Sequence, residues 1–146
     1  MTTSRANVLV VGGAGYIGSH VAHDLVEAGH RVKVFDNLSS GAVDNVPKGA
    51  EFVIGDLRRG GALEESLASG IDIVFHFAAR KAAGESMEVP HGYADNNIVG
   101  TLRLLRLMHE TGVRRFVFSS SAAVYGSPVT LPIDEEHPTK PENYYG

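Results

Sequence analysis

The sequence predicts an α/β fold in which a parallel β-sheet carries helices on both faces. Short apolar runs alternate along the chain with segments of helical period, and the apolar runs are continuous, which is typical of strands buried on both faces. With 146 residues the chain has the size of one domain. Strands that alternate with helices pair in parallel through right-handed crossovers, so we expect a doubly wound sheet.

The first predicted strand and helix occupy the N-terminal part of the chain. The run Asn7 to Val11, NVLVV, is apolar and leads directly into glycines, which indicates a buried strand. Helical spacing follows over residues 16–28 and ends at Gly29, a common helix stop. We expect the buried face of this helix to consist of Ile17, Val21, Leu25 and Ala28.

Four further strands and two further helices complete the predicted domain. The strands are expected at residues 31–35, 51–54, 71–77 and 115–119. A short helix is expected around residues 63–68, and a longer one from Pro90, which suits a first helical turn, to Thr111 before Gly112. These elements predict the strand order 3-2-1-4-5. After Ser121, repeated prolines indicate a loop of about two dozen residues, and loops of such length are usually functional.

Composition excludes several classes of protein. A net charge of -4 argues against a nucleic-acid partner, and Arg58 and Arg59 are expected to lie in a solvated loop. The sequence has no apolar run of membrane-spanning length and no signal peptide, so we expect a cytoplasmic location. Because cysteine is absent, disulfides and thiol catalysis are excluded. His20 and His23 lie three residues apart but lack a third ligand in a known motif, so no metal site is expected.

A glycine-rich turn between the first strand and helix indicates a dinucleotide site. Gly12, Gly15 and Gly18 have the spacing GxxGxxG. A helix N-terminus offers free N–H donors and the positive end of a dipole, small residues admit a pyrophosphate, and Gly18 allows close packing of helix and strand. Taken alone, the same glycines could form a tight turn without a ligand.

Two carboxylates extend this prediction to a specific cofactor. Asp36 lies 18 residues after Gly18 at the end of the second strand, where it can accept hydrogen bonds from ribose hydroxyls and repel a 2′-phosphate. Asp56 ends the third strand and is placed to meet the adenine amino group, although it could instead cap a turn. The sequence therefore predicts a Rossmann fold that binds NAD in preference to NADP.

Several longer segments resemble one known family. They are GGAGYIGSH at 12–20, DNLSSG at 36–41, HFAARKAAGES at 76–86, DNNIVGTLRLL at 95–105 and SSSAAVYG at 119–126. In this order they resemble the extended short-chain dehydrogenase/reductases that epimerise UDP-hexoses at C4, from Val8 to Gly146. The resemblance implies cofactor contacts from Gly12, Gly15, Tyr16, Ile17, Gly18, Asp36, Asn37, Leu38, Ser39, Ser40, Gly41, Asp56, Leu57, Phe77, Ala78, Ala79, Arg80, Lys81 and Asn96.

The resemblance also implies catalytic residues. Ser121 and Tyr145 match the serine and tyrosine of a Ser-Tyr-Lys set, although Ser121 could instead be a turn residue. The lysine would follow Tyr145 by four residues, beyond Gly146, and we expect the last strands and the sugar-binding region there as well. The chain also has Val11 where the family commonly has threonine. We therefore expect an incomplete NAD-binding domain over residues 1–146 that is inactive alone.

The implied reaction is an inversion at C4 of UDP-glucose or UDP-galactose. Tyr145 would remove the 4-hydroxyl proton while NAD+ takes hydride, and the 4-keto sugar would turn and be reduced on its other face. One alternative is a nucleotide-sugar 4,6-dehydratase or decarboxylase, although Ala122 and Ala123 stand where dehydratases have acidic residues. Another is a noncatalytic NAD-binding module. We also expect a homodimer or self-association, through the strand at 115–119 and the helix at 90–111.

Overall fold

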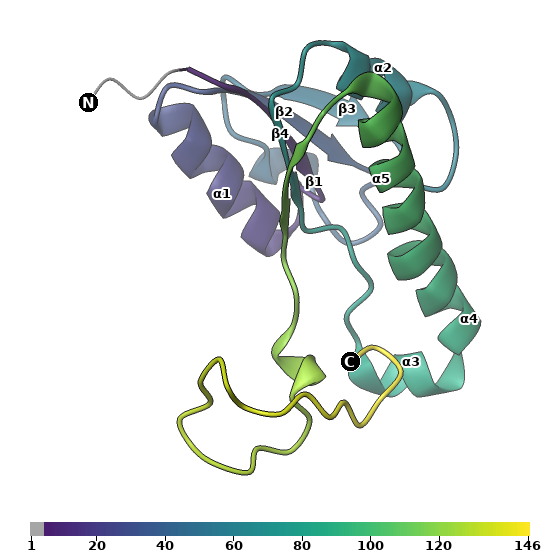
Figure 1. Ribbon diagram of the computed structural model, residues 1–146. Coiled ribbons are helices and arrows are strands. Elements are labelled where there is room, and N and C mark those ends of the chain that lie inside the picture. The colour runs from purple at the N-terminus through teal and green to yellow at the C-terminus, as the bar shows by residue number, and fades with distance from the viewer. Residues whose placement is uncertain (1–4) are drawn as a thin grey trace.

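A computed structural model describes residues 5–146 and contains one five-stranded parallel sheet (Figure 1). Its order is β3-β2-β1-β4-β5, which confirms the predicted doubly wound topology. The strands are β1 (Asn7–Val11), β2 (Arg31–Asp36), β3 (Glu51–Ile54), β4 (Ile73–His76) and β5 (Arg115–Phe118). β4 is shorter at both ends than expected, although Asp72 N–H and Phe77 N–H just outside it still donate to the carbonyls of Asn7 and Val11 over 2.8 Å.

Helices cover both faces of this sheet. α1 (Tyr16–Glu27) lies on one face, whereas α2 (Ala62–Ala68) and α5 (Gly100–Thr111) lie on the other (Figure 1). The helix expected at residues 90–111 consists of α4 (Pro90–Tyr93), a π-helical turn η2 (Ala94–Val99) and α5. α3 (Ala83–Glu88) was not expected, since its sequence has no apolar period and only Ser86 is buried. Short 3₁₀ turns are η1 (Val43–Asn45) and η3 (Ala122–Val124).

Alternating side chains of the strands fill two separate cores. Val8 and Val10 of β1 pack on the α1 side, together with Val32 and Val34 of β2. Leu9 and Val11 point to the opposite face and pack with the apolar residues of α2 and α5. Residues two apart on a strand share a face, so the continuous apolar run of β1 supplies both cores.

The buried face of α1 differs from the expected one by about one position. Gly18 and Ala22 are buried, while Ile17 is 56% exposed and Ala28 is exposed. A Cβ on Gly18 would run into the backbone of Gly12, so the two segments are in direct contact. This close approach determines how α1 is rotated about its axis. The spacing of apolar residues does not predict it, because glycine has no side chain.

His76 links the end of β4 to α5. The side chain is 2% exposed, and its Nε2 lies 2.8 Å from Thr101 Oγ1. Its ring packs against the rings of both Phe116 and Phe118, with centroids 6.0 and 5.8 Å away. Burial lowers the pKa of His76 to about 4, so the ring is neutral at pH 7.

The segment after Ser121 contains only the short turn η3 and otherwise follows an irregular path below the sheet (Figure 1). Inside this loop, Val129 N–H donates to His137 Nε2 over 3.0 Å, and the His137 ring is buried. The chain then returns to α3, where Tyr145 N–H donates to Ser86 Oγ over 3.1 Å.

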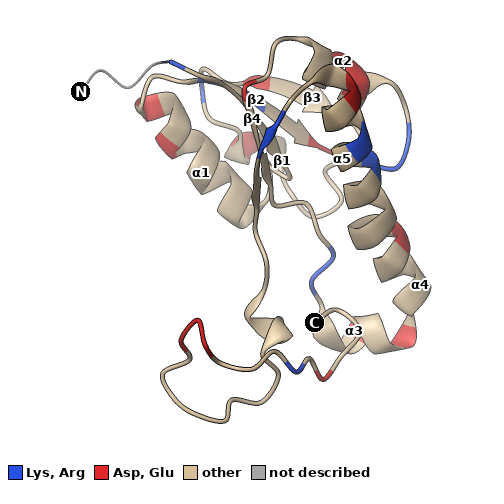
Figure 2. Ribbon diagram, viewed as in Figure 1, with Lys and Arg blue, Asp and Glu red and all other residues tan. Residues whose placement is uncertain are grey.

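Charged side chains are spread over the surface. Figure 2 shows acidic residues on α1 and α2 and residues of both signs on α5 and the loops. Within residues 5–146, none of the helices has the length and apolar character needed to cross a lipid bilayer.

Candidate functional site

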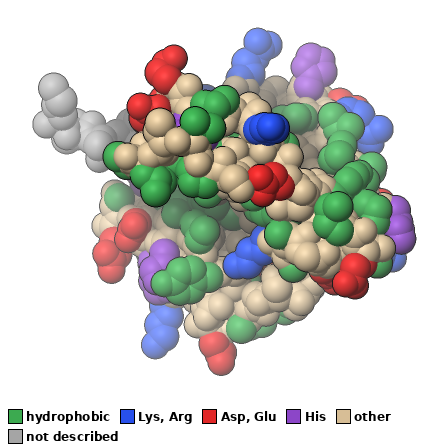
Figure 3. All heavy atoms as spheres, turned by 90° about the horizontal axis from the view of Figure 1, so that it is seen from below, with side chains coloured by type: hydrophobic (Ala, Val, Ile, Leu, Met, Phe, Trp, Pro, Cys, Tyr) green, Lys and Arg blue, Asp and Glu red, His purple; other side chains and the backbone are tan. Residues whose placement is uncertain are grey.

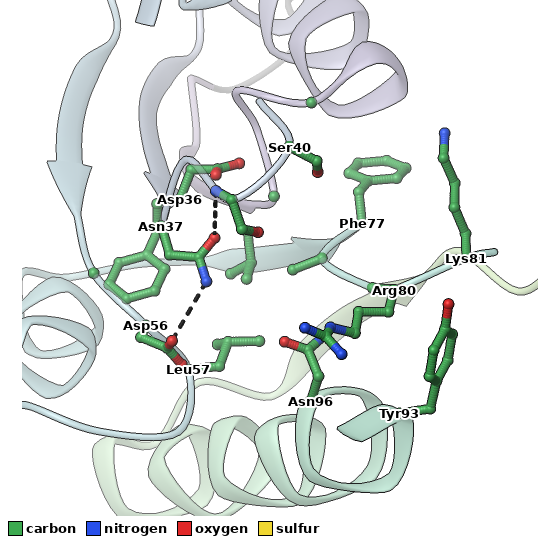
Figure 4. Close-up of a pocket in the computed structure, with 18 of the residues that line it drawn as sticks. Asp36, Asn37, Ser40, Asp56, Leu57, Phe77, Arg80, Lys81, Tyr93 and Asn96 are labelled. Atoms are coloured by element: carbon green, nitrogen blue, oxygen red, sulfur yellow. Dashed lines mark hydrogen bonds between the residues drawn. The ribbon is translucent and has the colours of Figure 1, made fainter. Parts of the chain in front are cut away.

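A pocket of about 300 Å³ opens at the carboxyl end of the sheet. Figure 3 views the molecule from this end and shows a recess near the middle of the face. Four chain segments that follow β1, β2, β3 and β4 form its walls, together with residues of α3, α4 and η2 (Figure 4). Ligands of doubly wound folds bind at this edge of the sheet.

The glycine turn after β1 forms one wall as bare backbone. Gly12 has φ of +81°, and a Cβ there would lie 2.5 Å from the backbone N of Ala78. Gly15 caps α1 without any side-chain hydrogen bond, so the first amides of the helix have no side-chain cap. This backbone cradle and helix N-terminus fit an anionic group such as a pyrophosphate.

Asp36 joins the glycine turn to the loop after β2. Ala14 N–H donates to its Oδ2 over 3.0 Å, and Leu38 N–H donates to its Oδ1 over 2.8 Å. Leu38 has φ of +59°, an unfavourable conformation that this contact helps to hold. Asp36 therefore holds the two loops together as well as lining the pocket. Its spacing from the glycines does not predict this structural role.

Asp56 is bound by an arginine that sequence reasoning placed in a solvated loop. Arg58 Nε and Nη2 donate to the two oxygens of Asp56 over 2.9 and 2.6 Å, and Arg58 Nη1 reaches Asp95 over 2.8 Å. These hydrogen bonds hold the pKa of Asp56 well below its usual range. The expectation that Arg58 is merely solvated is therefore wrong.

The wall opposite the glycine turn is fastened by side chains that sequence reasoning missed. Asn97 Oδ1 accepts from Arg80 N–H over 2.8 Å, and Asn97 Nδ2 donates to the Arg80 carbonyl over 2.9 Å. The hydroxyl of the buried Tyr93 lies 2.8 Å from the Ala82 carbonyl and 2.6 Å from Glu85 Oε2, so two acceptors share its one hydrogen. Tyr93 and Glu85 line the pocket. The one sequence signal for this role is the aromatic Tyr93 in the first turn of the expected helix.

The pocket brings together most of the residues proposed for the cofactor. The lining includes Gly12, Gly15, Asp36, Asn37, Ser39, Ser40, Asp56, Leu57, Phe77, Ala78, Ala79, Arg80, Lys81 and Asn96. Tyr16, Ile17, Gly18, Leu38 and Gly41 lie outside it. Tyr16 and Ile17 are exposed on the first turn of α1, while a Cβ on Gly41 would lie 2.6 Å from the Ala14 carbonyl.

Ser121 and Tyr145 both lie outside the lining of this pocket. Ser121 Oγ accepts from Ala123 N–H over 3.1 Å and thereby caps η3, the turn role that sequence reasoning left open. The Tyr145 ring meets the Tyr93 ring edge-on, with centroids 6.4 Å apart. A Cβ on Gly146 would lie 2.5 Å from the Ala123 carbonyl, so the end of the chain lies against η3.

Close relatives of this chain are UDP-glucose 4-epimerases. The enzyme of Streptomyces lividans is 51% identical over 140 residues, which cover 94% of this chain and 43% of the relative. That of Corynebacterium glutamicum is 47% identical and covers 95% of this chain and 42% of the relative. The chain thus spans less than half the length of these relatives.

This chain is also similar to solved structures of UDP-glucose 4-epimerases. A crystal structure of a UDP-glucose 4-epimerase superposes with a TM-score of 0.91 at 46% identity, covering 95% of this chain and 43% of that one. The Brucella ovis enzyme, solved in complex with NAD, gives 0.90 at 44% identity over 96% of this chain and 43% of that one. The model of the NAD dependent epimerase/dehydratase family matches residues 8–146. This match covers nearly the whole chain and confirms the family resemblance predicted from the motifs. The chain therefore belongs to the NAD dependent epimerase/dehydratase family.

Proposed function

We propose that this chain forms the NAD-binding part of an enzyme that epimerises a UDP-hexose at C4. The observation that carries the proposal is the pocket itself, where the glycine cradle and Asp36 share one cavity. Similarity to UDP-glucose 4-epimerases supports the reaction, and related enzymes from Brucella ovis and Bifidobacterium longum were solved with NAD and with NAD+ and UDP.

The described residues fit this cofactor. The cradle formed by Gly12 and Gly15 would hold the pyrophosphate against the start of α1. Each oxygen of Asp36 accepts one backbone N–H and keeps a further lone pair, which a ribose hydroxyl can use. When bound, NAD supplies a hydride acceptor and donor beside the sugar carbon.

Tyr145 and Ser121 are proposed to serve the sugar. Tyr145 would take and return the proton of the 4-hydroxyl, and Ser121, whose Oγ accepts from Ala123 N–H, would donate its own hydroxyl hydrogen to the same sugar. The contact of the Tyr145 ring with the pocket residue Tyr93 supports this placement. We place the sugar-binding residues and the partner lysine in the part of the relatives that this chain does not span.

The alternatives have less support. Ala122 and Ala123 form η3 beside Ser121 and offer no acid or base for dehydration. A noncatalytic NAD-binding module would have the same pocket, so only a measurement of enzymatic activity distinguishes it from an epimerase.

We expect the chain to bind NAD+ more tightly than NADP+, because the acidic side chain of Asp36 is buried where the adenosine ribose would lie. Asp36→Asn keeps one oxygen for the backbone donors but removes the charge, so it should reduce the preference on the order of tenfold. Calorimetric titration of both cofactors measures this ratio, and thermal unfolding checks that the variant folds. Equal or tighter binding of NADP+ by the unaltered chain would overturn the assignment.

We also propose that the chain associates with a second copy of itself. Ile98, Leu102 and Leu105 form an apolar stripe on the outer side of η2 and α5 and are 54%, 60% and 40% exposed. The edge strand β5 adds Val117 and Phe118, which are also exposed.

The expected cytoplasmic location stays a prediction.

Sedimentation at several concentrations is expected to show species larger than a monomer. Leu102→Glu should shift them toward monomer if the helical stripe carries the contact, and Val117→Lys should do so if the edge of β5 does. A single monomer at every concentration would show that neither surface drives association.

A further inference from the structure

We propose that Arg58 is a positioning residue, which holds Asp56 as a fixed carboxylate acceptor so that the pocket selects a purine with a 6-amino group over one with a 6-oxo group. The inference rests on the proposed NAD site and concerns selectivity within it. Asp56 lines the pocket directly, whereas Arg58 acts through Asp56.

Arg58 fixes both the plane and the direction of the Asp56 carboxylate. Its Nε and Nη2 form a two-pronged pair with Oδ1 and Oδ2, and its own backbone N–H donates to Oδ1 over 2.9 Å. Paired donors of this kind fix an acceptor in orientation as well as in place. Oδ1 therefore has two donors from Arg58, and Oδ2 has one.

The guanidinium is itself anchored on the far side. Arg58 Nη1 donates to Asp95 Oδ2 over 2.8 Å, so the arginine spans from the loop after β3 to the π-helical turn η2. Both Asp56 and Arg58 are largely shielded from solvent. Because Asp95 holds the guanidinium from the other side, Arg58 is not free to follow a rotation of the Asp56 carboxylate, and such a rotation would break the hydrogen bonds between them.

A second arginine holds the same loop without touching the carboxylate. Arg103 of α5 donates to the carbonyls of Leu57 and Gly60 over 2.9 and 2.6 Å, and it pairs with Glu64. The position of the loop backbone and the orientation of Asp56 thus have separate supports. This separation makes Arg103 a matched control for Arg58.

Asn37 marks the direction from which an amino group can reach Asp56. Asn37 Oδ1 accepts from Ser39 N–H over 3.0 Å, which leaves its NH2 group facing Asp56 Oδ2 (Figure 4). That contact is 3.4 Å long, at the outer limit of a hydrogen bond, so it is easily exchanged. The NH2 of a 6-aminopurine can replace it, whereas a 6-oxo group would turn a lone pair toward an ionised oxygen.

The test compares NAD+ with its hypoxanthine analogue, which has the oxo group in place of the amino group. Calorimetry on the unaltered chain is expected to show tighter binding of NAD+, on the order of tenfold or more. Arg58→Met should bring the two affinities several-fold closer, mainly by weakening NAD+ binding. Arg103→Met should weaken both ligands by similar factors and leave their ratio unchanged.

A merely structural role of Arg58 would lower both affinities equally, and that result would overturn the inference. It is also overturned if Arg103→Met changes the ratio as much as Arg58→Met does, or if the unaltered chain binds both dinucleotides equally. Thermal unfolding checks each variant. If Arg58→Met does not fold, Asp95→Asn can be used instead, because it weakens only the contact that holds Arg58 from the other side. This variant should lower the ratio of the two affinities to a smaller extent. An unchanged ratio would count against the inference.

The failure of this inference differs from a failure of the proposed function. If the unaltered chain binds neither dinucleotide, the NAD site itself is wrong. If NAD+ binds and the ratio does not depend on Arg58, the site stands and only the positioning role is lost.

Discussion

Gly18→Val is expected to abolish dinucleotide binding and to lower the free energy of unfolding by about 3 kcal/mol. A Cβ on Gly18 would run into the carbonyl of Gly12 and lie 2.9 Å from the Gly13 Cα. These are backbone atoms of the turn that forms the cradle, so no side chain can move aside to relieve the clash. The added volume must push α1 away from β1 and so deform the pocket wall. Urea unfolding and calorimetry with NAD+ measure the two effects.

Two other glycines provide controls. A Cβ on Gly84 would meet nothing within 4 Å, and its backbone is helical, so Gly84→Ala should be neutral or stabilise by up to about 1 kcal/mol. Gly29 also has open space but a φ of +86°, so Gly29→Ala should cost about 1 kcal/mol without changing NAD+ affinity. Near-normal stability and binding in Gly18→Val would contradict the close packing of α1 on the glycine turn.

Tyr145→Phe is expected to reduce the rate of UDP-galactose conversion about 10²–10⁴-fold in a chain continued as in the relatives. The substitution removes the oxygen that would carry the proton. It keeps the ring that packs edge-on against Tyr93 and the backbone N–H that Ser86 accepts, so thermal stability should change little. Turnover assays combined with thermal unfolding measure both quantities.

Tyr144→Phe is the matched control, since its ring is exposed and should leave turnover unchanged. We expect the 146-residue chain by itself to show no interconversion. Activity in that chain, or full activity in Tyr145→Phe, would require a different proton carrier.

The strand order was predictable from the sequence because each strand of a parallel sheet is a short apolar run, and each run here has flanking glycines or a helix. The rotation of α1 was not predictable, because the contact of Gly18 with Gly12 involves no side chain. α3 was missed for a related reason. Its one buried residue, Ser86, is polar and gives no hydrophobic period.

The candidate site shows the same division. The glycine spacing and the position of Asp36 at a strand end indicated where the pocket would lie, since the carboxyl ends of parallel strands meet at one edge. The fork between Arg58 and Asp56 and the clamp of Asn97 on Arg80 depend on loop geometry. The fork joins residues two apart and the clamp joins residues 17 apart, and neither follows from a periodic pattern in the sequence.

The π-helical turn η2 constrains the number of residues between α4 and α5. Its hydrogen bonds skip one residue more than those of an α-helix, so the turn accommodates an extra residue between α4 and α5. Deleting that residue would rotate α4 by about 100° relative to α5 and carry Tyr93 away from the pocket, while Leu104 stayed in the core. Insertions and deletions should therefore be tolerated in the irregular loop at 125–143 and excluded from 94–99, whatever side chains these six positions carry.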